Sequence, residues 1–166
     1  MARVYLSLGS NVSPRQHLLA ALDELRTQFG PIVVSPAYQG AAVGFDGATF
    51  INLAVGMDTE LDPSALNDWL HALEDRQGRR RDVPRFADRT LDLDIVFYDD
   101  LITSGPGHLQ IPRDELQFAF VLQPIADIAP GFVHPLSGLT MAQLWSAFPP
   151  EQEPLRVVSL EAEQAD

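Results

Sequence analysis

The 166-residue chain contains no cysteine. This absence excludes disulfide bridges, thiol catalysis and zinc sites with cysteine ligands. The sequence has no apolar run long enough to span a membrane, and Met1-Ala2-Arg3 leads into an expected strand rather than into a signal peptide. These absences favour a cytoplasmic protein that is held together by its own hydrophobic core.

Positive charge is also scarce. The formal net charge is −12 at pH 7, and the 11 basic residues are all arginine, with no lysine. Such an excess of negative charge disfavours binding to nucleic acid or to an anionic membrane. The hydrophobic content of 46% and the charged content of 20% are typical of a globular protein. We therefore expect a monomer with a single domain over residues 1–150, followed by an acidic, Pro/Glu-rich tail over residues 151–166 that frays.

The spacing of apolar residues predicts four strands, at 4–8, 32–38, 50–57 and 89–97. Two helices are expected between them, one from Ser13-Pro14 to Gly30-Pro31 and the other from Asp62-Pro63 to Gln77-Gly78. The order β-α-β-β-α-β indicates an α+β fold with a ferredoxin-like core, in which the helices cover one face of an antiparallel sheet. C-terminal helical additions follow, because a short strand at 108–111 precedes expected helices over 115–128 and 140–148.

The most informative stretch is the strand at 89–97. Strict alternation places Leu91, Leu93, Ile95 and Phe97 on one face, and Asp92 and Asp94 side by side on the other, with their Cα atoms about 6.5–7 Å apart. Two like charges on one strand face repel, so a positive charge must offset them. Either Arg89 or a divalent metal such as Mg²⁺, which binds carboxylates together with substrate phosphates, can supply it. A solvated outer face of an edge strand is the alternative.

Arginine is concentrated just upstream of this strand, at positions 76, 79, 80, 81, 85 and 89. The guanidinium fork matches phosphate geometry, and a carboxylate pair beside an arginine cluster is typical of phosphoryl transfer. Two other classes compete with this interpretation. An RNA-binding module with a ferredoxin-like fold would use the arginines, but two aspartates on the sheet argue against it. An inert interaction domain would leave the aspartate pair unexplained.

Several single residues have two interpretations. Asn52 lies in an apolar strand, where its amide either bonds to the backbone or points at a heterocycle. Asn11 either caps the first helix or contributes to a site. His71 and Glu74 are either solvated surface residues or neighbours of the arginine cluster, and Phe120 is a candidate core residue.

Four motifs together resemble the 6-hydroxymethyl-7,8-dihydropterin pyrophosphokinase family of folate biosynthesis. They are Gly9-Ser10-Asn11, Phe50-Ile51-Asn52, the segment from Glu74 to Gln77-Gly78-Arg79, and Arg89-Thr90-Leu91-Asp92-Leu93-Asp94-Ile95. The resemblance extends from about Val4 to Trp145. It implies a transferase that moves the β,γ-pyrophosphoryl group of ATP to the pterin hydroxymethyl oxygen and releases AMP.

The resemblance also implies roles for individual residues. Two Mg²⁺ ions would bind Asp92 and Asp94, and the catalytic charge would come from Arg79 and Arg89. The pterin would contact Asn11, Gly40, Val43, Phe50, Asn52 and Phe120. ATP would contact His71, Glu74, Arg81, Arg85, Ile95 and Arg113, with Arg81 and Arg85 in a mobile loop that closes over it.

The chain departs from the family pattern at three places. The family has Tyr-x-Thr-x-Pro-x-Gly where this chain has Tyr38-Gln39-Gly40-Ala41-Ala42-Val43-Gly44. Phe86 stands where many members have tryptophan. Arg113 and Phe118 stand where the family has His and Arg, and we expect Arg113 to replace one of the two lost phosphate contacts. A catalytically weakened paralogue that binds pterin and nucleotide is therefore the alternative to a working pyrophosphokinase.

Overall fold

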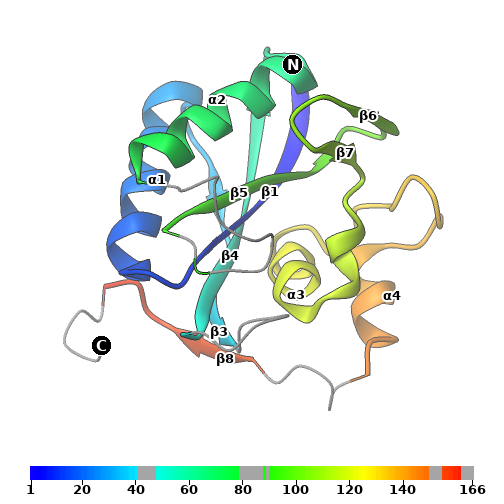
Figure 1. Cartoon of the computed structure of the whole chain (residues 1–166). Helices are drawn as coiled ribbons and strands as arrows, with labels where there is room; N and C mark the ends of the chain where they lie inside the picture. Colours follow the sequence, from blue (N-terminus) through cyan, green and yellow to red (C-terminus); the bar gives the residue numbers. More distant parts are fainter. Residues whose placement is uncertain (41–47, 79–87, 89, 150–154, 162–166) are drawn as a thin grey trace.

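The computed structural model describes residues 1–40, 48–78, 88, 90–149 and 155–161 (Figure 1). The first part of the chain forms the predicted core: β1 (Ala2–Ser10), α1 (Pro14–Phe29), β2 (Val33–Val34), β3 (Ala37–Gly40), β4 (Phe50–Thr59), α2 (Pro63–Arg76) and β5 (Asp92–Tyr98). The second part comprises β6 (Thr103–Gly105), β7 (Leu109–Ile111), the 3₁₀ helix η1 (Asp114–Gln117), α3 (Ala119–Ile128), α4 (Met141–Ser146) and β8 (Arg156–Val158).

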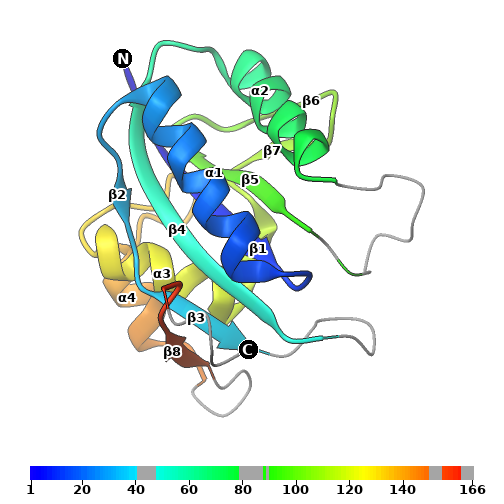
Figure 2. The ribbon, with the colours of Figure 1, turned by 90° about the vertical axis from the view of Figure 1, so that its left-hand side faces the viewer.

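The main sheet is antiparallel and has the order β5-β1-β4-β3-β8, with β2 also paired to β4. The last core strand lies beside the first, and β1 and β4 are central, which confirms the ferredoxin-like arrangement. Figures 1 and 2 show α1 and α2 on one face of this sheet and α3 and α4 on the other. The C-terminal helical additions thus cover the face that the ferredoxin-like core alone leaves open.

Two apolar cores lie on the two faces of the sheet. Under α1 and α2, the predicted helical stripes are buried, including Leu18, Leu22, Leu25, Leu66, Leu70 and Leu73. Under α3 and α4, a second cluster gathers residues such as Tyr5, Val121, Leu122, Ile125 and Met141. Asp62 begins α2 as predicted, since its carboxylate accepts a hydrogen bond from the Ala65 N–H at 2.8 Å.

Strict alternation along β5 is wrong at its C-terminal end. The pairing of β1 with β5 shifts register between Tyr5 and Leu6, so that Val96 is an extra residue in β5. Such a bulge reverses the facing of the residues beyond it. Phe97 therefore packs in the cluster under α3 and α4, whereas Leu93 and Ile95 lie in the cluster under α1 and α2.

Three other segment predictions need correction. The strand expected at 32–38 is divided into β2 and β3, because Pro36 between them has no N–H for the ladder. The helix expected at 115–128 is interrupted at Phe118, whose extended backbone (φ −101, ψ 138) ends η1 and begins α3. Part of the tail expected to fray is β8, which pairs with the open edge of β3. Among the residues that the structure describes, no helix is long and apolar enough to cross a membrane.

Candidate active site

The register of the sheet brings a carboxylate and an amide into one row. Gly9 of β1 pairs with Asp92 of β5 on one side and with Asn52 of β4 on the other, and Tyr38 of β3 continues the row beyond Asn52. Directly opposed residues of an antiparallel pair present their side chains on one sheet face. Because adjacent strands lie about 4.8 Å apart, the backbones at Asp92 and Asn52 are roughly 10 Å apart.

Gly9 is essential to this row, although the sequence motif alone did not identify it as a site residue. A Cβ placed on Gly9 would lie 2.4 Å from the Asn52 Oδ1 and 3.8 Å from the Phe50 Cδ1. Only glycine therefore lets the amide of Asn52 lean over β1. A glycine inside a strand is a general sign of such a close approach.

Asn52 is 5% exposed, and no hydrogen bond to its amide is found among the described residues. Its amide has not lost all access to solvent, so it remains available on the sheet face to a ligand with donor and acceptor atoms. Asn11 is not the N-cap of α1, because that position belongs to Ser13. Its Nδ2 donates to the Ala48 carbonyl at 3.0 Å and to the Asp88 carboxylate at 2.7 Å, which joins β1 to two distant segments.

The aspartate pair of β5 has a cationic neighbour that we did not predict. The Arg113 Nη1 lies 3.7 Å from the Asp94 Oδ1, and the guanidinium side chain is only 15% exposed. We expected Arg89 or a metal to offset the pair. Arg89 lies outside the described residues, whereas Arg113, which we expect at the ATP phosphates, lies directly beside Asp94. The Asp94 side chain is 32% exposed, so it faces solvent in part while Arg113 lies against its carboxylate.

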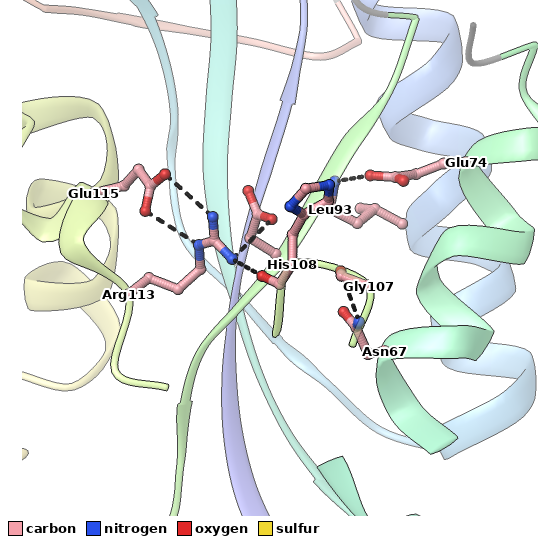
Figure 3. Close-up of polar contacts among 8 residues, drawn as sticks. Asn67, Glu74, Leu93, Gly107, His108, Arg113 and Glu115 are labelled. Atoms are coloured by element: carbon pink, nitrogen blue, oxygen red, sulfur yellow. Dashed lines mark hydrogen bonds and ion pairs between the residues drawn. The ribbon is translucent and has the colours of Figure 1, made fainter. Parts of the chain in front are cut away.

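Arg113 is held from three sides. Its Nε and Nη2 donate to the two carboxylate oxygens of Glu115, each at 3.1 Å, and its Nη1 donates to the His108 carbonyl at 3.1 Å (Figure 3). The backbone of Arg113 is anchored as well, since its N–H donates to the Val96 carbonyl of β5 at 3.3 Å. Bidentate pairing of this kind fixes the orientation of a guanidinium.

The electrostatics of the site are dominated by Asp94. Removal of water from its carboxyl group and the charge of Asp92 raise the pKa of Asp94 well above the usual range, and Arg113 offsets this increase only in part. Burial acts to lower the pKa of Arg113, but Asp94 and Glu115 outweigh burial and raise it. Among the described residues, Asp92, Asp94 and Glu115 thus outnumber the guanidinium of Arg113 at this site.

The donor set fits Mg²⁺ held jointly by protein and substrate. Asp92 and Asp94 supply two carboxylates, and the buried hydroxyl of Thr90 has no hydrogen-bond partner among the described residues. Within the same part of the chain, no group of three or more acidic or histidine side chains forms a complete metal cage. Mg²⁺ commonly binds through one or two carboxylates and completes its coordination with water and phosphate oxygens.

Glu74 is buried, which overturns the interpretation of Glu74 as a solvated residue. It is 1% exposed, and its Oε2 accepts a hydrogen bond from the Leu93 N–H at 2.7 Å (Figure 3). Leu93 lies between the two aspartates, so Glu74 fixes the strand that carries them. His71, one turn earlier on α2, lies beside the β6–β7 turn, where Asn67 donates to the Gly107 carbonyl at 3.1 Å. Ile95 is buried in the core under α2.

The aromatic residues of the expected pterin pocket lie on β4 and α3. Phe120 is half-buried rather than a full core residue, and its ring stacks on that of Phe118 with a centroid distance of 5.3 Å and an interplanar angle of 12°. The Tyr38 hydroxyl donates to the Asp127 carboxylate and ties β3 to α3. Gly40 pairs with Phe50 at the end of β3. Five predicted site residues lie outside the described residues: Val43, Arg79, Arg81, Arg85 and Arg89.

The fold and the site define an α+β protein of ferredoxin-like topology whose sheet carries a carboxylate pair beside a buried amide. The sequence profile of the 7,8-dihydro-6-hydroxymethylpterin-pyrophosphokinase (HPPK) family matches residues 5–130. The chain belongs to this family, which confirms the resemblance found in its motifs.

Individual relatives agree with this assignment. The chain is 41% identical over 152 residues to the 2-amino-4-hydroxy-6-hydroxymethyldihydropteridine pyrophosphokinase of Pseudomonas aeruginosa, covering 89% of this chain and 92% of that protein. It is 38% identical over 143 residues to the protein of the same name in Synechocystis, covering 84% and 72%. Among solved structures, the HPPK-DHPS of Plasmodium falciparum superposes with a TM-score of 0.70 at 14% identity, covering 87% of this chain. The chain spans 44% of that longer protein, and this likeness supports the fold alone.

Proposed function

We propose that the chain transfers the β,γ-pyrophosphoryl group of ATP to the hydroxymethyl oxygen of 6-hydroxymethyl-7,8-dihydropterin and releases AMP. Membership of the HPPK family supports this reaction, and the relatives in P. aeruginosa and Synechocystis carry the name of the enzyme. The weakened paralogue finds no support among these relatives. The observation that carries the assignment of the site is the row in which Gly9 separates Asp92 from Asn52.

The pterin binds at the Asn52 end of this row. The amide of Asn52 offers a donor and an acceptor to the edge of the heterocycle, and burial makes such a pairing selective. Phe50 and Phe120 provide the two ring faces between which the pterin stacks. The pocket is completed by Asn11 and by the backbone at Gly40 and Val43.

The triphosphate of ATP binds at the Asp92 end. Asp92 and Asp94 hold two Mg²⁺ ions, which when bound neutralise charge on the phosphates. The guanidinium of Arg113, already fixed by Glu115, contacts the same phosphates. Further positive charge comes from Arg79 and Arg89, with Arg81 and Arg85 in a loop that closes over ATP. His71, Glu74 and Ile95 lie on the side of the adenosine.

In the transfer, the hydroxymethyl oxygen forms a bond to the β-phosphorus. The bond between that phosphorus and the α,β-bridging oxygen breaks, and AMP departs with the bridging oxygen, while the hydroxyl proton is released to water. An aliphatic alcohol is a very weak acid, so positioning of the two substrates and charge neutralisation carry most of the rate. The row geometry supports such positioning, because Asp92 and Asn52 share one row of the sheet.

Mass spectrometry tests the proposal. Protein, ATP, Mg²⁺ and hydroxymethyl-dihydropterin should yield AMP and the pterin diphosphate in equal amounts. Asp92→Asn and Asp94→Asn should abolish both products. Asp58→Asn is the matched control, because Asp58 lies at the far end of β4 and pairs with Arg3. Absence of AMP with the unaltered chain would overturn the proposal.

Two expectations from the sequence extend the proposal. We propose a monomer, for which light scattering during size-exclusion chromatography should give a mass near 18.3 kDa. We also propose a cytoplasmic location, which fractionation of cells that produce the chain would test.

A further inference from the structure

Arg113 contacts its partners unequally. The hydrogen bonds to Glu115 and to the His108 carbonyl are all 3.1 Å long, whereas Arg113 and Asp94 approach only to 3.7 Å. The guanidinium is thus held by hydrogen bonds to Glu115 and His108, and its contact with Asp94 is longer and weaker. Loss of the Asp94 contact would leave the anchoring hydrogen bonds intact.

Asp94 depends more strongly on the contact. Its carboxylate shares a strand face with Asp92, and the Arg113 guanidinium lies 3.7 Å from its Oδ1. The backbone N–H of Arg113 donates to the carbonyl of Val96, two residues beyond Asp94 on β5. This backbone hydrogen bond keeps Arg113 close to Asp94 independently of the contact between their side chains. Loss of the Arg113 contact would leave Asp94 beside the like charge of Asp92, whereas Arg113 would keep a second carboxylate in Glu115.

We propose that Arg113 is an internal counter-ion for Asp94, which a divalent cation displaces, and that Glu115 retains the displaced guanidinium. This inference rests on the proposed role of Asp92 and Asp94 as metal ligands. In the metal-free protein, Arg113 limits the repulsion on β5. When the cation binds, the guanidinium of Arg113 leaves Asp94 and pairs with Glu115 and with the phosphates. Through this exchange Arg113 sets the metal affinity of Asp94, and Glu115 acts on that affinity by positioning Arg113.

Metal binding can be measured without nucleotide or turnover. Titration with Mn²⁺, followed through the electron paramagnetic resonance signal of the free ion, gives a dissociation constant for each variant. Arg113→Gln removes the competing charge and should tighten Mn²⁺ binding by roughly three- to tenfold. Arg3→Gln makes the same change in net charge at a distant ion pair with Asp58 and should leave the constant unchanged.

A double-mutant cycle separates an action through Arg113 from simple loss of charge. Glu115→Gln should weaken Mn²⁺ binding, because the guanidinium then turns fully to Asp94. If Glu115 acts through Arg113, the same change made on top of Arg113→Gln should have little further effect. Equal effects in both backgrounds would show that Glu115 contributes only its charge, and would overturn the proposed exchange.

The remaining outcomes distinguish this inference from the proposed function. If Asp94→Asn leaves Mn²⁺ binding unchanged, the metal assignment itself is wrong. If Asp94→Asn abolishes binding but Arg113→Gln binds Mn²⁺ equally or more weakly, the counter-ion inference alone fails. Arg113→His, which is neutral at pH 8, is the second variant should Arg113→Gln fail to fold, and it must also tighten binding at that pH.

Discussion

Replacement of Glu74 tests how the aspartate strand is held. β5 pairs with β1 on one side only, so the N–H of Leu93 on its outer edge has no partner in the sheet. The buried carboxylate of Glu74 accepts this N–H at 2.7 Å. Glu74→Ala would remove a charge-assisted hydrogen bond worth about 1.5–3 kcal/mol and leave a buried donor unpaired.

The expected loss of unfolding free energy for Glu74→Ala is about 2–4 kcal/mol. For a chain of this size, 1 kcal/mol corresponds to roughly 2–4 °C, so the Tm should fall by about 4–16 °C. Glu74→Gln retains an acceptor for the Leu93 N–H and removes one negative charge near Asp94, which together should change the Tm by less than about 4 °C.

Thermal unfolding of the metal-free protein, with amide exchange at Leu93 by NMR, provides the assay. Glu60→Ala is the control, because Glu60 is exposed and such substitutions usually change stability by less than about 0.5 kcal/mol. We expect the exchange at Leu93 to accelerate in Glu74→Ala and to remain slow in Glu74→Gln. If Glu74→Ala has the same Tm as the unaltered chain but binds nucleotide more weakly, the structural role is refuted. Adenosine binding would then be the function of Glu74.

Three further predictions concern charge. The pKa of Asp94 is raised in the folded protein, so its ionisation costs stability as the pH rises above the ordinary value of 3.8. Thermal melts of the metal-free protein should therefore show that Asp94→Asn raises the Tm by about 1–4 °C at pH 7 and leaves it unchanged below pH 3.8. Arg113→Ala should lower kcat/KM by about 10- to 150-fold, and Phe118→Arg should help little; a silent Arg113→Ala would contradict the phosphate contact. Burial lowers the pKa of His134, whose Nδ1 accepts the Leu136 N–H at 3.1 Å. The free energy of unfolding should therefore decrease as the pH falls below about 6.5, and His134→Leu should remove this decrease in melts between pH 5 and 8.

The fold was largely predictable because local signals agree with it. Helix caps, apolar periodicity and the order of elements all lead to the ferredoxin-like core. The bulge at Val96 was not predictable, because β5 reads as an unbroken alternation and the extra residue is defined only by pairing with Tyr5 and Leu6 of β1. Pairing of β8 with β3 was hidden for a similar reason, since three residues in an acidic tail form a strand only because an open edge is available.

The arrangement of the candidate site residues was predictable where they lie close together along one strand. Spacing placed Asp92 and Asp94 on a shared face, whereas Asn52 was assigned to the site only through the family resemblance. The contribution of Gly9 was not, since it depends on the simultaneous register of three strands. The contact of Arg113 with Asp94 joins residues far apart in the sequence and depends on the turn at His108, about which local patterns carry no information.

The two departures at positions 113 and 118 are best understood as one change. An arginine at 118 would stand at the start of α3, where Phe118 instead stacks on Phe120. The guanidinium at 113 lies beside Asp94 and is oriented by Glu115, while the ring at 118 makes an aromatic contact with Phe120. A second arginine at 118 would disrupt the ring stack and duplicate the phosphate contact that we propose for Arg113. This reasoning explains why Phe118→Arg should bring little benefit while Arg113 is present.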